Sequence, residues 1–240
     1  MFKSILVLLI AALIAIPAKS QTADEIIQKS LKASGYSQNA KSINTLKITG
    51  KMTMMGMEMT FVIKNKKPAK NKMEMEIMGQ TMVQCINGDD SWMINPMSGS
   101  NKAEKLPKEQ VEKAKNQNDF LNNALDDYKA KGTTIDYLGK ENFDGKACYK
   151  LKVKTKDGEE SLMYIDSQND LAYAINKKMS AMGKEMEITM YFKDYKKVGE
   201  ILMAHTIDTK ADGQDQMQMV WEKVEVNIPI PDEDFNMPAE

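Results

Sequence analysis

The chain has 240 residues, and its 33 basic residues nearly balance its 34 acidic ones, giving a formal net charge of −1. This balance argues against a nucleic-acid partner, because domains that bind nucleic acids are usually strongly basic. All the basic residues are lysines, so the chain lacks the guanidinium fork that binds phosphate or carboxylate through two hydrogen bonds.

The N-terminus has the pattern of a cleavable export signal. Lys3 precedes an apolar run of twelve residues, and Ala18-Lys19-Ser20 places small residues at positions −3 and −1 before Gln21. The run is shorter than the about 20 residues of a membrane-spanning helix, which makes an uncleaved anchor the weaker alternative. We expect a signal peptide at residues 1–20 and an exported chain, residues 21–240, that forms one domain. No cysteine follows the cut, so we expect no lipid anchor. No later segment is apolar enough to span a membrane, so we do not expect an integral membrane protein.

A helix opens the exported chain, and strands follow it. Thr22 and Glu25 form a capping box, and Gly35 is placed to end the helix. From Leu46 the apolar residues alternate with polar ones, which is typical of a half-buried strand. A turn at Met55-Gly56 would fold this segment into a hairpin with one apolar face. The expected cross-strand pairs are Met54–Met57, Met52–Met59, Gly50–Phe61 and Ile48–Ile63.

The same hairpin pattern recurs along the chain. Met78-Gly79 and Met182-Gly183 each separate two alternating segments, and Asn-Gly or Asp-Gly turns stand at 87–88, 144–145, 157–158 and 212–213. The regular spacing predicts a long antiparallel meander. The apolar residues on the expected inner parity of these two hairpins include Met73, Met75, Ile77, Met82, Met186, Ile188, Met190 and Phe192.

The alternation stops between Pro96 and Gly132, where we expect a helical insertion at about 105–131. A polar helix is predicted near 107–116, and a second helix at about 119–131 would carry Phe120, Leu121 and Leu125 on one face. We expect the second helix to pack against the apolar side of the sheet.

The sequence offers little for catalysis. His205 is the only histidine, which excludes a multi-histidine zinc site, and we interpret it as an ordinary strand residue. Glu74 and Glu76 share one side of a strand, a pattern that a solvated face explains better than a catalytic pair. We expect no enzyme, no cofactor and no metal site.

The methionines are the unusual feature, since 20 of the 21 remain after signal removal. Four Met-x-Met pairs, at 52/54, 57/59, 73/75 and 217/219, place two thioethers on one strand face, and thioethers select Cu(I). Methionine also fills apolar cores, and its flexible, polarizable side chain suits surfaces that accept varied apolar partners. The sequence leaves open a filled core and an acyl-chain cavity, and it favours both over copper.

Cys85 and Cys148 are the two cysteines of the chain, so that one disulfide is possible in an oxidising compartment. Such a bond would contribute about 4 kcal/mol for a loop of this length. The strand phases do not bring the two cysteines together.

Several segments resemble LolA-like periplasmic lipoprotein carriers. Ile86–Pro96, which reads INGDDSWMINP, is similar to the family's Asp-Gly…Trp-x-Tyr-x-Pro segment. Phe143–Leu151, Asp194–Leu202 and Ile230–Phe235 are similar to later family segments and stand in the same order. The chain departs from the best-known carriers in having no arginine, because those carriers use a cavity arginine to govern acyl binding and release.

The resemblance implies an α+β fold that is mainly β with a few helices: a half-open antiparallel β-barrel whose helices cover the concave apolar face. It further implies a periplasmic carrier for the acyl chains of lipoproteins or lipids, with transfer proteins of the inner and outer membranes as further partners. The alternatives are a protein-interaction or sensor module on the same fold, and Cu(I) binding by methionines.

Strand parity and helix face select the residues expected to line the apolar cavity. They are Ile48, Met52, Met54, Met57, Met59, Phe61, Ile63, Met73, Met75, Ile77, Trp92, Phe120, Leu121, Leu125, Met186, Ile188, Met190 and Phe192.

Overall fold

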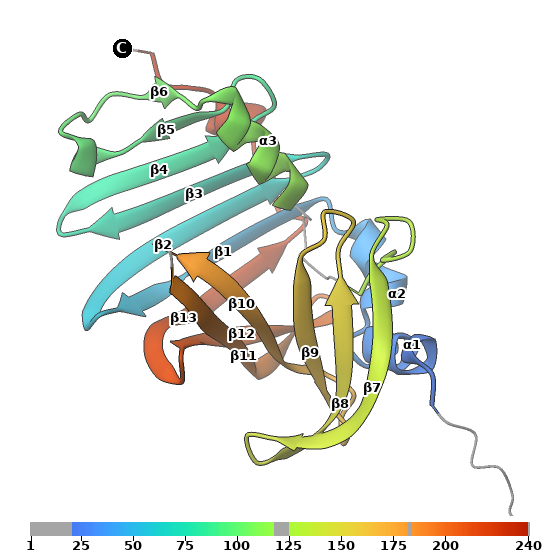
Figure 1. Cartoon of the computed structure of the whole chain (residues 1–240). Helices are drawn as coiled ribbons and strands as arrows, with labels where there is room; N and C mark the ends of the chain where they lie inside the picture. Colours follow the sequence, from blue (N-terminus) through green and yellow to red (C-terminus); the bar gives the residue numbers. More distant parts are fainter. Residues whose placement is uncertain (1–20, 118–124, 182–183, 240) are drawn as a thin grey trace, which may run out of the picture.

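The structure is a computed structural model that describes residues 21–117, 125–181 and 184–239. The expected signal peptide, Phe120, Leu121 and the Met182-Gly183 turn lie outside these ranges. The described residues are mainly β: thirteen strands form one antiparallel sheet, in the order β6-β5-β4-β3-β2-β1-β13-β12-β11-β10-β9-β8-β7 (Figure 1). The sheet is not closed, because β6 and β7 form its two edges.

Sequence neighbours pair throughout the sheet except at its centre, where β1 pairs with β13. The strands are β1 (Thr45–Met54), β2 (Met57–Lys66), β3 (Lys70–Ile77), β4 (Gln80–Ile86), β5 (Trp92–Ile94), β6 (Glu104–Lys105), β7 (Thr134–Phe143), β8 (Lys146–Lys154), β9 (Glu160–Asp166), β10 (Ala172–Ala181), β11 (Lys184–Val198), β12 (Ile201–Ala211) and β13 (Gln214–Val226). The predicted meander is confirmed on both sides of the β1–β13 pair.

The first hairpin has the predicted register. Met54 pairs with Met57, Met52 with Met59, Gly50 with Phe61 and Ile48 with Ile63. Met55 and Gly56 both have positive φ, 51° and 77°, which is the geometry of the two-residue turn that matches the twist of the flanking strands. Turn chemistry and alternation therefore fixed this register together.

Two short helices and a 3-10 turn precede the sheet: α1 (Ala23–Ala33), α2 (Tyr36–Asn39) and η1 (Ala40–Ser42). The capping box is confirmed, because the Glu25 backbone N–H donates to Thr22 Oγ1 at 3.2 Å and the Thr22 N–H donates to the Glu25 carboxylate at 3.3 Å. Gly35 follows the helix with φ 69°. The apolar side chains of α1 and α2 pack with those of β7, β8 and β9 in one buried cluster.

Between β6 and β7, the described residues contain one helix of the two predicted. α3 (Lys108–Gln117) is confirmed, and its Val111 packs with Ile86 and Leu106 at the β4–β5 end of the sheet (Figure 1). The second predicted helix is wrong in its described part, since residues 125–132 form turns. Asp127 has φ 48°, a left-handed conformation that interrupts a helix.

The C-terminal tail, which follows β13 in the chain, crosses the face of the sheet that lies opposite the first-hairpin methionines. The tail contains one 3-10 helix, η3 (Asp232–Phe235). Another 3-10 helix, η2 (Pro96–Ser98), follows β5. Phe235 is fully buried, and its carbonyl accepts hydrogen bonds from Trp92 Nε1 at 3.0 Å and from Cys85 Sγ at 3.3 Å. The tail therefore forms a second small core on the face opposite the first-hairpin methionines.

This arrangement corrects the placement of Trp92. Trp92 pairs with Cys85 on β4. The Cys85 side chain lies on the face opposite to that of Met82 and Ile86, and Trp92 therefore lies on that opposite face too. The loop at 87–91 sets that pairing, and alternation alone does not carry across it.

The two cysteines are both free and buried. Cys85 lies under the C-terminal tail, whereas Cys148 packs with Tyr164, Ala174 and Tyr191. Burial raises the pKa of each thiol to about 11. Within the described ranges, no helix is both long and apolar enough to cross a membrane.

Candidate ligand-binding face

One face of β3, β2, β1 and β13 carries a continuous apolar cluster, which we call the methionine face. Its buried members are Leu46, Ile48, Met52, Met59, Phe61 and Met75. Partly buried side chains pack around them: Ile63, Met73, Ile77, Met82, Met203, Met217, Met219, Trp221, Val224 and Val226.

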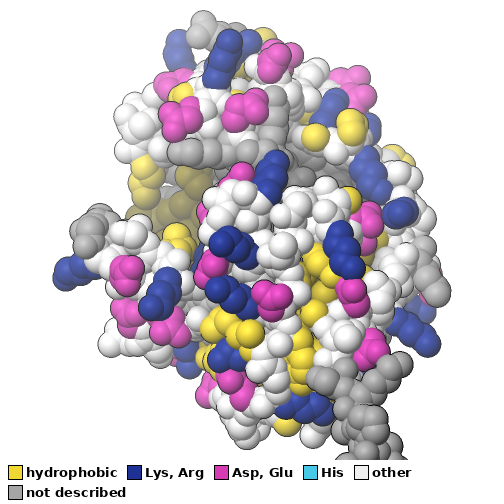
Figure 2. Space-filling model, turned by 45° about the vertical axis from the view of Figure 1, so that its right-hand side comes forward, with side chains coloured by type: hydrophobic (Ala, Val, Ile, Leu, Met, Phe, Trp, Pro, Cys, Tyr) yellow, Lys and Arg dark blue, Asp and Glu magenta, His cyan; other side chains and the backbone are white. Residues whose placement is uncertain are grey.

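Strand register extends the methionine face toward β11. Met217 pairs with Thr209, which pairs with Met190, and Met219 pairs with Ile207, which pairs with Phe192. Residues directly opposite each other on antiparallel strands share a face. Met190 and Phe192 are only partly buried. Figure 2 shows a hollow between the upper and lower parts of the molecule, with hydrophobic side chains inside it.

Most of the predicted cavity residues meet on this face. Ile48, Met52, Met59, Phe61, Ile63, Met73, Met75 and Ile77 belong to its cluster. Met54 and Met57 share its parity at the hairpin end, where they are 38% and 41% exposed. Ile188, Met190 and Phe192 lie on the β11 extension, and Met186 pairs with Met179 nearer the hairpin end.

The remaining predicted residues do not join them. Leu125 packs with Ile26, Ile27 and Leu31 of α1 at the β7–β9 end of the sheet. Trp92 lies on the other face. Phe120 and Leu121 fall outside the described residues, as does the helix face that they were expected to form.

The alternation of the sequence did not lead us to predict the part of the methionine face that β12 and β13 contribute. Met203, Met217, Met219 and Trp221 belong to its cluster. The spacing Met217-x-Met219-x-Trp221 carried the signal, because alternate residues of a strand share a face. What the sequence lacked was the pairing of β13 with β1.

Gly50 allows the methionine face to pack closely at its centre. A Cβ at this position would overlap the Val220 carbonyl and lie 2.8 Å from Cζ of Phe61. The absent side chain therefore leaves the Phe61 ring room to lie over the β1 backbone. Phe61 is 1% exposed as a result.

Three polar side chains interrupt this apolar surface. Trp221 Nε1 and Thr209 Oγ1 are buried and have no hydrogen-bond partner among the described residues. His205 is buried as well, and its Nδ1 lies 2.9 Å from the Met203 carbonyl, which as a pure acceptor requires the proton on Nδ1. Its ring centroid is 6.4 Å from that of Trp221. His205 is thus a strand residue with a satisfied ring nitrogen, whereas Trp221 and Thr209 each offer a donor.

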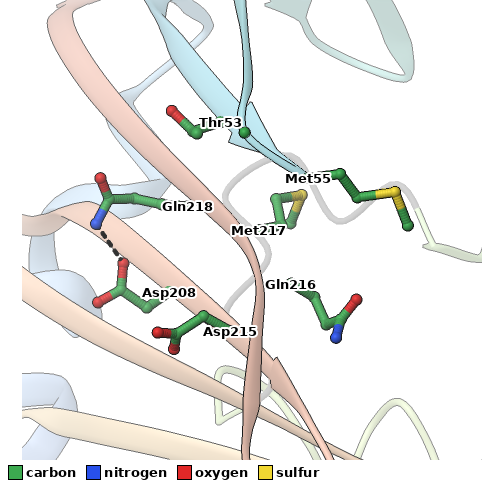
Figure 3. A pocket seen from close by; sticks show the side chains of 8 residues that line it. Thr53, Met55, Asp208, Asp215, Gln216, Met217 and Gln218 are labelled. Carbon is green, nitrogen blue, oxygen red and sulfur yellow. Dashed lines mark hydrogen bonds between the residues drawn. The ribbon is translucent and has the colours of Figure 1, made fainter.

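A small polar pocket lies at the hairpin ends of β1, β12 and β13. It has a volume of about 310 Å³ and is lined by Thr53, Met55, Gly56, Asp208, Asp215, Gln216, Met217 and Gln218. Figure 3 shows the Gln218 amide directed at the Asp208 carboxylate, to which it donates at 2.8 Å. Thr53, Gln218 and Asp208 pair across the three strands, on the parity opposite the methionine face. The pocket adjoins the methionine face at Met217, which belongs to both.

Asp208 is held as a carboxylate in this pocket. Burial raises the pKa of its carboxyl group, but hydrogen bonds from Lys193 and Gln218 outweigh burial, and the pKa lies below its usual value. Lys193 Nζ is 2.6 Å from the Asp208 carboxylate. In residues 21–117, 125–181 and 184–239, no group of three or more His, Cys, Asp and Glu side chains is arranged to hold a metal ion.

The fold is that of LolA-like proteins. A LolA superfamily protein from Nitrosomonas europaea matches with a TM-score of 0.56 and 12% identity, over 90% of this chain and 98% of that one. A domain from Vibrio parahaemolyticus assigned to outer membrane lipoprotein sorting matches with a TM-score of 0.53 and 14% identity, over 88% and 97%. A DUF1329 family protein from Desulfovibrio piger matches with a TM-score of 0.55 and 11% identity, over 89% and 96%.

One family model, described as "Uncharacterized protein", matches residues 58–239. The chain belongs to that family. No curated protein matches the chain significantly. The resemblance of the sequence to LolA-like proteins is confirmed by the structural neighbours, and at these identities it is confirmed for the fold.

Proposed function

We propose that this protein is a periplasmic carrier that binds the acyl chains of lipoproteins or lipids on the methionine face, for transfer toward the outer membrane. In this proposal residues 1–20 are the cleaved signal, and residues 21–240 form one half-open barrel with helices partly covering its concave side. Transfer proteins of the two membranes would load and unload it. The LolA-like fold supports this proposal, because one structural neighbour is assigned to lipoprotein sorting.

The observation that carries the proposal is an apolar face with two unpaired buried donors. A buried polar group without a partner costs about 1–3 kcal/mol. Trp221 Nε1–H and the Thr209 hydroxyl would both be satisfied by the ester or amide carbonyls that join acyl chains to their headgroup. Ligand sites combine such a largely apolar lining with a few polar groups that fix orientation.

The methionine side chains suit acyl chains of varied length. Methionine has three rotatable bonds and adapts its shape to the neighbour it contacts. Each buried methylene of a bound chain contributes about 0.8 kcal/mol, so a single acyl chain supplies substantial affinity. The face extends by strand register from β3 to β11 and is mostly apolar.

Native mass spectrometry of gently purified protein tests the proposal directly. We expect co-purified lipid, and renewed uptake when delipidated protein is mixed with a diacylated lipopeptide. Protein that is repeatedly purified without lipid, and that takes up none on addition, would contradict the proposal.

The two tryptophans locate the bound chain, because the sequence contains no others and they lie on opposite faces. Trp92→Phe leaves Trp221 as the only indole, and Trp221→Phe leaves Trp92. A lipid with brominated acyl chains should quench the fluorescence of Trp221 strongly and that of Trp92 little. Equal quenching of the two would place the lipid elsewhere.

A further inference from the structure

Three of the four Met-x-Met segments that lie within single strands come together in the structure. Met57-x-Met59 on β2, Met52-x-Met54 on β1 and Met217-x-Met219 on β13 lie on three adjacent strands. The strands are in register, so that the methionines form two rows across the sheet. The outer row is Met57–Met54–Met217, and the inner row is Met59–Met52–Met219.

All six side chains lie on the methionine face. Directly opposed residues on antiparallel strands have Cβ atoms about 4.5–5.5 Å apart. The Sδ atom stands two bonds beyond Cβ on a flexible stem, so neighbouring sulfurs of one row can turn toward a common point. The β1–β13 register irregularity lies at Thr49/Gly50 and leaves both rows intact.

The two rows differ in exposure. Met52 and Met59 of the inner row are buried, 7% and 4% exposed, whereas Met54 and Met57 of the outer row are 38% and 41% exposed. Met217 and Met219, which complete the two rows, are both partly buried. A small ion entering from the hairpin end would therefore meet Met54 and Met57 first, with Met52 and Met59 behind them.

The chemistry that distinguishes six methionines from six leucines is the sulfur atom. Leucine buries a similar apolar area but carries no sulfur. Neutral thioethers are soft ligands, and soft thioether and thiolate ligands select Cu(I) among the metals available to proteins. A monovalent ion held by neutral ligands needs no buried carboxylate, and the partial exposure of the outer row limits the cost of removing water from the ion.

We propose that this six-methionine array binds a soft monovalent cation, Cu(I) or its analogue Ag(I), with the outer row as the principal ligand set. The site does not depend on the proposed carrier function. Lipid uptake needs an apolar face, whereas cation binding needs sulfur.

The test is titration with Ag(I), and with Cu(I) under anaerobic conditions in competition with a chelator. Cys85→Ala and Cys148→Ala form the background, because free thiols would also bind these ions. Met54, Met57 and Met217 are changed together to Leu. Each Met-to-Leu exchange usually lowers the free energy of unfolding by less than about 1.5 kcal/mol. Loss of an outer-shell partner alone typically costs about 10–100-fold in metal affinity, so loss of three ligands should weaken binding by more than about 100-fold.

The matched control changes three exposed methionines outside the array, Met78, Met97 and Met179, to Leu. The control should bind Ag(I) as tightly as the background protein. Equal affinity of the two variants overturns the proposal, as does a background protein that binds no tighter than about 1 μM.

Methionine methyl NMR on the unmodified chain keeps the test decisive if the cysteine-free background does not fold. Once the two thiols are saturated, added Ag(I) should shift the ε-methyl signals of the six array methionines and leave those of Met78 and Met97 in place. Uniform shifts of all methionines, or shifts only outside the array, would contradict the site.

Discussion

Gly50 is the single residue whose missing side chain matters most to the methionine face. It lies in the interior of β1, where glycine is ordinarily unfavourable because it loses more conformational freedom than other residues. Here the Val220 carbonyl and the Phe61 ring occupy the space that a Cβ would need. Glycine at position 50 therefore lowers the strand propensity of β1 but allows the Phe61 ring to pack closely against its backbone.

We predict that Gly50→Ala destabilises the protein by about 1–3 kcal/mol, because overpacking displaces the Phe61 ring or the β13 backbone. Urea denaturation measures the change. Gly56→Ala is the control, since Gly56 has open space around it and its φ of 77° alone disfavours alanine. An equal or smaller loss at Gly50 than at Gly56 would show that the close approach does not matter.

Asp208 illustrates how one pair of residues makes stability depend on pH. Its pKa in the folded protein is lowered, so the unfolded chain binds more protons than the folded one in the acidic range. The stabilisation from its contacts with Lys193 and Gln218 is fully present above about pH 4, the unfolded pKa, and is lost as pH falls through the folded pKa.

Asp208→Asn should therefore lower stability at pH 7 by about 0.5–1 kcal/mol, a modest value because Lys193 is half exposed. The difference from the wild type should vanish near pH 2. Denaturant titrations at the two pH values check this, with Asp215→Asn at an exposed neighbouring carboxylate as the control. A difference that persists unchanged in acid would exclude the carboxylate as its source.

Among the elements, the C-terminal tail packs against the β3–β5 part of the sheet on the face opposite the methionine face. Phe235 fills the core that Trp92, Cys85 and Val83 form. Salt bridges fasten the tail on either side: Lys64 to Asp234 at 2.7 Å, and Lys66 and Lys70 to Asp232 at 2.9 Å each. The sheet is therefore covered on both sides at this end, by α3 on one face and the tail on the other.

Phe235→Ala should cost about 3–5 kcal/mol, because it empties a fully buried ring site and loosens the carbonyl that Trp92 and Cys85 contact. Thermal unfolding followed by Trp92 fluorescence in the Trp221→Phe background would report it locally. Asn236→Ala, at the exposed next residue, should change little. If both variants unfold alike, the tail does not stabilise the sheet.

At the scale of the whole molecule, the apolar core is divided along one open sheet. Separate buried clusters lie at the β7–β9 end, at the β4–β5 end and on the methionine face between them. The two end clusters combine helix and sheet side chains, whereas the middle one has many partly buried members. A ligand that covers this middle region would add the contacts that the ends obtain from helices.

Bound lipid should consequently raise the stability of the whole protein. At a free ligand concentration 100 times the dissociation constant, linkage adds about 2.7 kcal/mol to the free energy of unfolding. Calorimetry of delipidated protein, with and without added diacylated lipopeptide, measures the shift in melting temperature. An unchanged melting temperature at saturating lipid would contradict binding to the folded state.

Local sequence patterns are enough to predict which residues share a face within each hairpin. Alternation assigned Met52, Met54, Met57 and Met59 to one side, and the Met-Gly turn fixed their register, because a two-residue turn leaves one way to pair the strands. The capping box likewise placed the start of α1 from local contacts alone. These are interactions between residues close together in the chain.

The way in which the hairpins combine depends on contacts between segments that are far apart in the chain. The pairing of β1 with β13 brought Met217 and Met219 beside Met52 and Met54, and no local signal specifies a contact between such distant segments. The five-residue loop before β5 turned Trp92 to the other face, and the left-handed Asp127 interrupted the second predicted helix. Alternation fixes the face within a strand, but it does not pass through loops or between distant strands, and there packing of the whole chain decides.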